Sequence, residues 1–397
     1  MDDRNIREQL VHGEHAAVQI VNSDEELSSS MKEKMEKFSP SLCIYIAPEN
    51  LQKGNENAFA PEIVSIGPFH HGKQGLESME KHKWRYLRAL LTRKPNLETT
   101  FDDCVKAIRQ LEQRARKCYE EPINMGSNEF VEMMIVDGCF LIELFLNYSI
   151  KGLRHRWDLI FSKNWMLFSV RSDMILLENQ LPFFVLQRLF DLVPVPKQCD
   201  QSLLQLAFRF FKIILPAGDE EVLQVKFTRE GNHLLDLVRN CYLPSFPRVL
   251  AKKNETQRSI NSAEKLKQSG IKFKKANNTD SLLDVKFAKG TLKIPPLKIH
   301  NYTNAILRNL IALEQCSKGC TLHITSYVFF MDGLIQSPQD MKLLHGRGII
   351  ANCIGSDDMV PEFFKKLCDE IIVKDFYYAG LCEQVNAYKR TNWFNYF

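Results

Sequence analysis

The sequence lacks a long uncharged apolar run. A helix that spans a bilayer needs about 18 to 20 such residues, and the two closest candidates are interrupted. Arg209 and Lys212 fall within the run from 203 to 215, and Glu178 falls within the run from 174 to 190. We therefore expect the chain as given to be soluble and cytoplasmic.

The sequence also lacks an excess of charge of one sign. It has 52 Lys and Arg against 48 Asp and Glu, which leaves a net charge of +4 over 397 residues. Proteins dedicated to nucleic acid usually have a clear basic bias, so we expect no nucleic-acid partner. Because 45% of the residues are hydrophobic, the chain can bury a sizeable core, as one large domain or two closely packed ones.

The eleven cysteines include no Cys-x-x-Cys pair, so they do not resemble a disulfide framework. Cys316 and Cys320 are four residues apart, but no further Cys or His pair completes a zinc site at standard spacing. The start, Met1–Arg4, has no apolar core of a signal peptide. These features predict buried thiols in a protein that faces the cytosol.

The short motifs of common enzyme classes are also missing. We find no P-loop, dinucleotide fingerprint, Gly-x-Ser-x-Gly elbow, His-Glu-x-x-His or kinase signature. We expect no cofactor and no metal. The missing motifs weaken the case for an enzyme without excluding one.

The patterns that are present favour a mainly α-helical fold with a small β component, of the α+β class. The segment 130–146 is apolar on nearly all faces, which is typical of a helix at the centre of a helical core. The residues 282–287 and 291–294 flank a turn at Lys289-Gly290 and predict a short β-hairpin near 282–299.

The distribution of polar residues predicts the domain organisation. Residues 1–39 are polar and charged and predict a flexible arm. Residues 40–397 predict a single large helical domain, near the start of which 44–46 and 63–66 are short β-prone runs. Within it, residues 251–280 are rich in lysine and poor in aliphatic side chains, which favours a surface loop.

Several longer phrases resemble one family, and they occur in its order. They closely resemble the plant domain of unknown function 247 family over about residues 40–390, and so many motifs in sequence make the resemblance highly specific. The phrases are Val64–Gly72, Met79–Leu87, Asp137–Phe145, Asp173–Phe184, Ser281–Phe287, Asn309–Cys316, Tyr327–Asp332 and Gly348–Asn352.

The resemblance implies a protein of unknown activity that is associated with the cytosolic face of the plasma membrane. Members generally continue past the region similar to Leu381–Tyr388 into one hydrophobic helix, which would anchor them. This chain stops at Phe397, so we expect either that the anchor was removed or that the member is naturally short. Some members are linked to signalling and recognition, including pollen self-recognition, which implies an unknown protein partner.

Carboxylates inside apolar runs are the most informative anomaly. Glu143 lies between 140–142 and 144–146, and Glu178 lies between 175–177 and Leu181. Burying an unpaired carboxylate costs several kcal/mol, so each needs a partner. The favoured interpretation is structural: hydrogen bonds to arginine or backbone that join helices.

The alternative is a carboxylate-based catalytic site. It would take one acid from each of two segments, as in glycosidases or di-metal sites. The candidates are Asp137, Glu143 and Glu178, with His71 as a further candidate on the loop that follows Gly67-Pro68. The enzyme hypothesis predicts that these groups converge on an open pocket with shifted pKa values.

A basic stripe follows this loop. Lys81, Arg85 and Arg88 are spaced i, i+4 and i+7 and so share one helix face. Such a face can bind phosphates or an anionic membrane, although the favoured interpretation is a solvated face or pairing with the buried acids, because most charged helix faces serve solvation. Adjacent His70 and His71 point apart and have no third ligand at proper spacing, which favours a role in holding the loop over zinc binding.

The leading hypothesis is a non-enzymatic recognition or signalling protein. It predicts exposed aromatic or apolar patches together with a paired, inaccessible acidic network. The rival is the enzyme described above.

Overall fold

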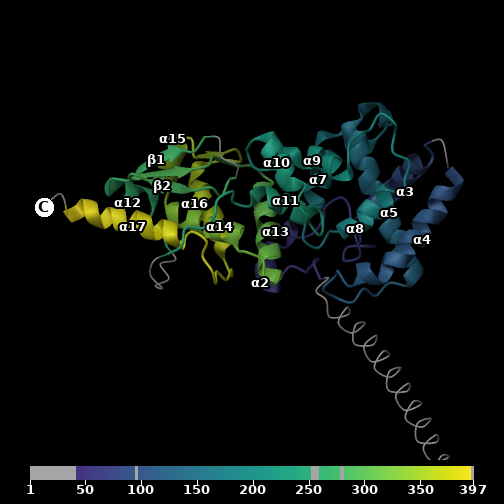
Figure 1. The fold of residues 1–397 in the computed structure, drawn as a ribbon, viewed down its shortest axis with the longest axis horizontal. Coiled ribbons are helices and arrows are strands. Elements are labelled where there is room, and N and C mark those ends of the chain that lie inside the picture. Colours follow the sequence, from purple (N-terminus) through teal and green to yellow (C-terminus); the bar gives the residue numbers. More distant parts are fainter. Residues whose placement is uncertain (1–41, 94–96, 252–258, 278–280, 395–397) are drawn as a thin grey trace, which may run out of the picture. The chain divides into compact units, whose positions relative to one another are not determined.

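The computed structural model describes residues 42–93, 97–251, 259–277 and 281–394. The chain divides into two units, residues 1–42 and residues 43–397, and the elements named below belong to the second (Figure 1). The predicted arm, residues 1–39, lies outside the described residues.

The secondary structure confirms the predicted class, mainly α with a small β component. The first helices are α2 (Glu49–Gln52), α3 (Glu77–Leu91), α4 (Leu97–Arg116), α5 (Ser127–Ser149), α6 (Leu159–Ser162), α7 (Asn164–Asp173), α8 (Phe183–Phe190), α9 (Leu203–Phe211), α10 (Glu220–Phe227) and α11 (Leu234–Tyr242). The later elements are α12 (Ala263–Gln268), β1 (Lys272–Lys275), β2 (Lys286–Ala288), β3 (Thr291–Ile294), β4 (Leu297–Ile299), α13 (Thr303–Cys316), α14 (His323–Leu334), α15 (Pro338–Gly346), β5 (Ile350–Asn352), α16 (Val360–Cys368) and α17 (Ala379–Phe394). Short 3-10 helices are η1 (Glu56–Ala58), η2 (Lys151–Leu153), η3 (Lys212–Ile214) and η4 (Asp357–Met359).

Helix α5 is the centre of the helical core, as predicted. Residues 133–146 are buried without a break, because α3, α4, α8 and α9 all pack against α5 (Figure 1). Gly138 permits the close approach of α8: a Cβ atom there would lie 2.3 Å from Cδ1 of Leu189. No helix among the described residues is long and apolar enough to cross a membrane.

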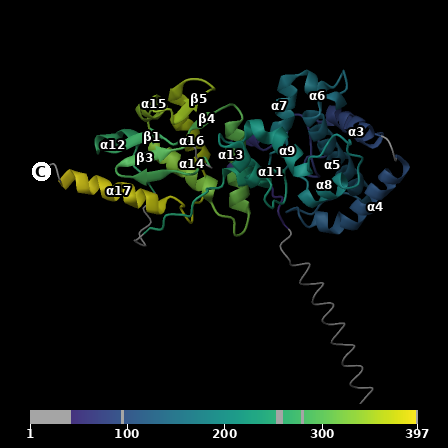
Figure 2. The same ribbon diagram turned by 45° about the horizontal axis from the view of Figure 1, so that its top comes forward.

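The predicted hairpin is formed by β2 and β3. They pair antiparallel around Lys289 and Gly290, both with positive φ (48° and 71°), which suits the tight turns that join hairpin strands. The last residues of the predicted segment, 297–299, do not continue the hairpin. After Pro295-Pro296, β4 pairs in parallel with β5, while β1 adds to β3 in parallel and completes a three-stranded sheet (Figure 2).

Two other segments differ from the sequence analysis. The predicted loop at 251–280 contains α12 and β1, with Leu266 and Phe273 buried. The β-prone runs at 44–46 and 63–66 form no ladder; Ile44 makes only an isolated parallel bridge with Tyr119. The first run bonds to the backbone of Cys118 and Glu120 and to the Glu120 carboxylate, and the second bonds to side chains.

Candidate functional site

An extended segment, residues 62–67, is held in the core by side chains instead of by a neighbouring strand. The carboxylate of Asp173, at the end of α7, accepts three of its backbone N–H groups at 2.7 to 3.0 Å, from Glu62, Ile63 and Val64. Asp173 is 3% exposed. Backbone donors away from water require acceptors. This one side chain supplies the acceptors for three consecutive N–H groups of the extended segment.

Asn179 and Asp137 bind the rest of the segment. Oδ1 of Asn179 accepts the N–H of Ile66 at 2.6 Å, and its Nδ2 donates to the carbonyl oxygens of Val64 and Asp173 at 3.0 and 2.9 Å. Oδ2 of Asp137, on α5, accepts the N–H of Gly67 at 2.8 Å. We call residues 62–67 with Asp137, Asp173 and Asn179 the clasp.

Gly67 is required by the geometry of the clasp. Its φ is +79°, and a Cβ atom there would lie 2.4 Å from the carbonyl oxygen of Gln180. That oxygen also accepts the hydroxyl of Tyr119 at 3.1 Å. Both the left-handed backbone and the close approach exclude a side chain at this position.

Lys83 neutralises Asp137. It projects from the buried face of α3, is 0% exposed, and its Nζ lies 2.6 Å from Oδ1 of Asp137 and 2.6 Å from Oε1 of Glu80. A third contact, 3.2 Å, reaches Oγ of Ser65 in the clasp. Burial raises the pKa of Asp137, and the Lys83 ammonium opposes that rise.

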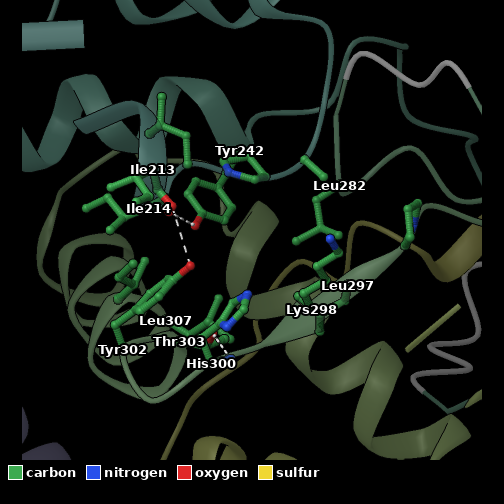
Figure 3. Close-up of a pocket in the computed structure, with 15 residues that line it drawn as sticks. Ile213, Ile214, Tyr242, Leu282, Leu297, Lys298, His300, Tyr302, Thr303 and Leu307 are labelled. Carbon is green, nitrogen blue, oxygen red and sulfur yellow. Dashed lines mark hydrogen bonds between the residues drawn. The ribbon is translucent and has the colours of Figure 1, made fainter. Parts of the chain in front are cut away.

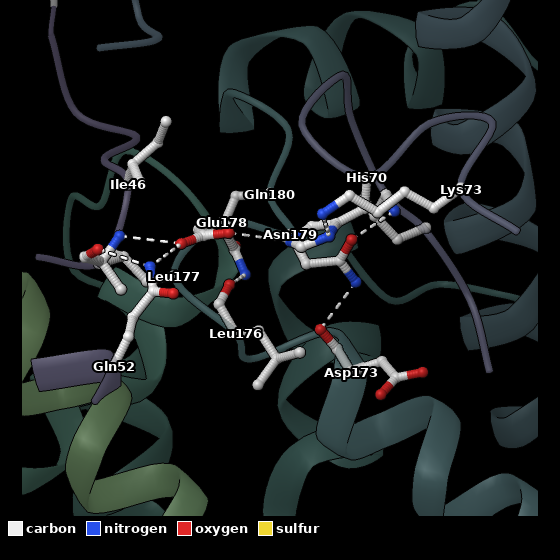
Figure 4. Close-up of polar contacts among 12 residues, drawn as sticks. Ile46, Gln52, His70, Lys73, Asp173, Leu176, Leu177, Glu178, Asn179 and Gln180 are labelled. Carbon is white, nitrogen blue, oxygen red and sulfur yellow. Dashed lines mark hydrogen bonds and ion pairs between the residues drawn. The ribbon is translucent and has the colours of Figure 1, made fainter. Parts of the chain in front are cut away.

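Glu178 joins three parts of the chain (Figure 4). Its Oε1 accepts the N–H of Ala47 at 3.0 Å and the amide of Gln52 at 3.2 Å, and its Oε2 lies 3.1 Å from Nε2 of His70. Nδ1 of His70 is 2.8 Å from Nζ of Lys73. Because an ammonium only donates, that ring nitrogen is the acceptor, which places the ring hydrogen on Nε2, facing Glu178.

Glu143 has a different partner, the Arg93 side chain, which reaches it through Nη2. Among the described residues, Oε2 of Glu143 and Nη1 of Arg93 have no hydrogen-bond partner. Burial raises the pKa of Glu143, and Arg93 opposes the rise. Glu143 is therefore held by Arg93, and it shares no partner with Asp137 or Glu178.

Comparison with known proteins places these residues in a family context. The model of the DUF247 family, described as plant proteins of unknown function, matches residues 44–397. The chain belongs to this family. The UPF0481 protein At3g47200 of Arabidopsis thaliana is 34% identical over 380 residues, which cover 89% of this chain and 78% of that protein. Another UPF0481 protein of the same plant, At3g02645, is 22% identical over 469 residues, 94% of this chain and 87% of that protein. No solved structure matches.

In this DUF247 protein the acidic candidates do not share contacts. Asp137 bonds Lys83 and Gly67, Glu143 bonds Arg93, and Glu178 bonds Ala47 and Gln52 and lies 3.1 Å from His70, so three carboxylates use three separate sets of partners. His71 is half-buried, and its Nδ1 has no partner among the described residues. Within the described ranges no group of three or more His, Cys, Asp or Glu could hold a metal ion.

The sequence analysis missed Lys83, Asp173 and Asn309. Oδ1 of Asn309, on α13, accepts the N–H of Leu177 at 2.8 Å, and its amide donates to the carbonyl oxygen of Ala58 at 2.7 Å. Each of the three lies within a DUF247 phrase that was quoted for the resemblance. The available signal was a polar residue on an otherwise apolar helix face, which is clearest for Lys83 between Met79 and Leu87.

The predicted basic stripe lies on the outer face of α3. Lys81, Arg85 and Arg88 are exposed, and Trp84 beside them is 46% exposed. We call these four residues the basic face. The opposite face of α3 is buried and consists of Met79, Lys83, Tyr86, Leu87, Leu90 and Leu91. No ion pair is recorded for the three cations among the described residues, so they are not the partners of the buried acids.

Three cavities of the described chain are lined by residues other than the predicted catalytic candidates. The one in Figure 3, of about 230 Å³, is mostly apolar; the hydroxyls of Tyr242 and Tyr302 at its wall donate to the carbonyl oxygens of Ile214 and Ile213 at 3.5 and 3.4 Å. The others measure about 880 and 420 Å³. None of the three is lined by Asp137, Glu143, Glu178 or His71.

Proposed function

We propose that the protein is a non-enzymatic recognition and signalling protein that works at the cytosolic face of a membrane, and that the basic face contacts anionic lipid. The observation that supports this is the two-sided character of α3. Its inner face is fixed against α5, whereas its outer face presents three cations and one indole ring to solvent.

The expected strength of this contact is modest. A Lys or Arg near an anionic leaflet contributes about 1 kcal/mol, so three contribute about 3 kcal/mol, and a tryptophan at the headgroup level adds to this. Stable attachment usually needs a second signal. We therefore propose that the basic face orients the protein on the membrane while a second contact, with a protein partner or a membrane anchor, supplies the remaining affinity.

The separate pairing of the acids favours this function over the alternative, an enzyme built on the Asp137/Glu143 and Glu178 segments. A carboxylate pair that works as acid and base needs both groups at one substrate. Here Asp137 and Glu178 are each bonded to backbone N–H groups and to a cation or imidazole, which is the geometry of groups that join segments.

The test is binding to vesicles of phosphatidylcholine with 30% phosphatidylserine, measured by co-sedimentation at low salt. We expect the parent chain to bind and the triple variant Lys81→Ala, Arg85→Ala, Arg88→Ala to lose most of the binding. A control triple variant, Lys298→Ala, Lys342→Ala, Arg347→Ala, removes the same charge from exposed positions elsewhere and should bind like the parent.

Two outcomes decide the proposal. Equal binding of the α3 variant and the parent would reject the basic face as the lipid contact. Equal losses in both triple variants would reject it as well, because net charge alone would then account for the binding.

A further inference from the structure

The cavity of about 880 Å³ has the size of a small-molecule site, for which roughly 300 to 1,000 Å³ is typical. Four segments line it. They are the loop after α11 (243–248), the end of α13 with the following loop (314–322), the first residue of α14, and residues 372–377; Arg229 also belongs to the lining. We call it the cationic cavity.

Its charged residues leave an excess of positive charge. Glu314 is fully engaged: Arg239, behind the wall, donates to its Oε1 at 3.0 Å, and Thr325 donates to its Oε2 through both N–H and hydroxyl at 2.9 and 2.8 Å. Asp375 pairs with Arg248 at 2.5 Å. Two cations of the lining, Arg229 and Lys374, remain exposed with no ion pair recorded among the described residues.

Two guanidinium groups, Arg248 in the lining and Arg239 next to it, also have unused donors. Nε of Arg239 and Nε of Arg248 are buried and have no hydrogen-bond partner among the described residues, and Arg239 is 7% exposed. A guanidinium N–H can only donate, and buried donors in folded proteins nearly always have an acceptor. The donors of Arg248 in the lining and of Arg239 beside it therefore outnumber their acceptors, and an anion would supply an acceptor.

The lining also contains aromatic side chains. Phe246 and Tyr377 are joined by a hydrogen bond of 2.9 Å from the Tyr377 hydroxyl to the Phe246 carbonyl oxygen, and the ring of His323 meets Tyr377 edge-on at 4.7 Å. Burial, together with Arg239 and Arg248, lowers the pKa of His323 to about 4, against the opposing effect of Asp375. The imidazole is therefore neutral at pH 7 and presents a flat, uncharged surface.

We propose that the cationic cavity binds a small aromatic molecule that carries an anionic group. Arg229 and Lys374 hold the anion, and Phe246 and Tyr377 hold the ring system. This site is separate from the basic face of α3, so the proposal stands or falls independently of membrane binding.

The probe is 8-anilinonaphthalene-1-sulfonate, an aromatic sulfonate whose fluorescence rises in an apolar site. Its matched control is N-phenyl-1-naphthylamine, which has the same rings and no sulfonate. We expect the folded full chain to bind the sulfonate with a saturable, one-site isotherm, and the amine more weakly. Failure of the sulfonate to bind, or tighter binding of the amine, would reject an anion site.

The variant that tests the lining is Arg229→Met with Lys374→Met. Exposed charged contacts are weak individually, so we expect the double variant to reduce sulfonate affinity about fivefold to tenfold and to leave amine affinity unchanged. The control Lys151→Met with Lys342→Met removes two exposed charges elsewhere and should match the parent. Unchanged sulfonate affinity in the first variant, or an equal loss in the control, overturns the assignment.

His323 reports where the probe binds. Its imidazole signals, assigned with a His323→Asn variant, should titrate near pH 4 in the free protein, and the bound sulfonate should raise this pKa because it offsets Arg239 and Arg248. The amine should not raise it. An unaltered His323 titration at saturating sulfonate would place the probe elsewhere and overturn the proposal.

Discussion

The clasp and the cationic cavity use the same kinds of side chain in opposite ways. In the clasp, buried acids and amides each bond to a named backbone or side-chain partner, so the polar groups cancel one another. Among the residues that line the cavity, cations outnumber acids, and Nε of Arg248 has no acceptor among the described residues; the same holds for Nε of Arg239, which bonds Glu314 from outside the lining. A satisfied buried network stabilises one fold, whereas an unsatisfied one is suited to a ligand.

The largest expected effect is the loss of Lys83. Replacing Lys83 with Met leaves Asp137 and the inner oxygen of Glu80 without their cation, and removing one partner of a buried pair costs about 3 to 5 kcal/mol. Urea denaturation should show this loss in the free energy of unfolding. The matched control is Lys81→Met, two residues away on the exposed face, which should change it by less than about 0.5 kcal/mol; equal effects would contradict the pairing.

Next is the pH dependence of the clasp. Burial raises the pKa of Asp173 to about 6 from an ordinary 3.8, against three backbone hydrogen bonds that lower it. The folded chain therefore binds a proton at a pH where the unfolded chain does not, so the free energy of unfolding rises as the pH falls from about 7 to about 4. The gain is at most about 3 kcal/mol at 1.36 kcal/mol per pKa unit.

This gain is measured as the difference between the parent and Asp173→Asn, because other groups titrate over the same range. The difference should widen in favour of the parent as the pH falls. A difference that stays constant between pH 7 and pH 4 would show that Asp173 keeps an ordinary pKa in the folded chain.

A smaller effect is expected for Asp173→Asn at pH 7. The asparagine oxygen can still accept two N–H groups, but its amide would face the N–H of Glu62. Losing this hydrogen bond at an exposed residue costs about 0.5 to 1.5 kcal/mol. Urea denaturation checks this against Asp200→Asn, an exposed acid of the same type. If both variants unfold at the same urea concentration, the carboxylate does not hold the clasp.

The smallest effect is expected in the cavity. Arg229→Met with Lys374→Met should change the free energy of unfolding by less than about 0.5 kcal/mol. Both side chains are exposed, and neither forms an ion pair with a described residue. Thermal or urea unfolding measures this directly. A loss as large as that of Lys83→Met would mean that the cavity wall, like the clasp, is a stabilising element.

The fold class, the central helix and the hairpin could be predicted because each depends on local pattern. The apolar run at 130–146 by itself indicates a buried helix, and the turn at Lys289-Gly290 by itself indicates the hairpin. The runs at 44–46 and 63–66 also have β character, but the acceptors of their N–H groups lie far along the chain. They are the carbonyl of Cys118 and the carboxylate of Glu120 for the first run, and Asp173 and Asn179 for the second. Nothing in either run indicates these distant partners.

The candidate functional residues likewise include some that the sequence predicts and some that it does not. The need for partners at Glu143 and Glu178 follows from the cost of a buried charge, and the exposure of Lys81, Arg85 and Arg88 agrees with the predicted helix face. The cationic cavity could not be predicted, because its lining comes from segments as far apart as Arg229 and Tyr377. Only the folded backbone brings those residues together.

The span of the polar contacts has a consequence for how the chain folds. Asp173 bonds residues about 110 positions earlier, Asn309 bonds Ala58 across 251 positions, and the Asn50 amide reaches the Glu370 carbonyl oxygen across 320. During synthesis the segment around residues 44–67 leaves the ribosome long before its acceptors exist. Such non-local closure slows folding. The segment can form its backbone N–H contacts only after the chain has been translated as far as Asn179, and its contacts with Asn309 and Glu370 only after α13 and the loop after α16.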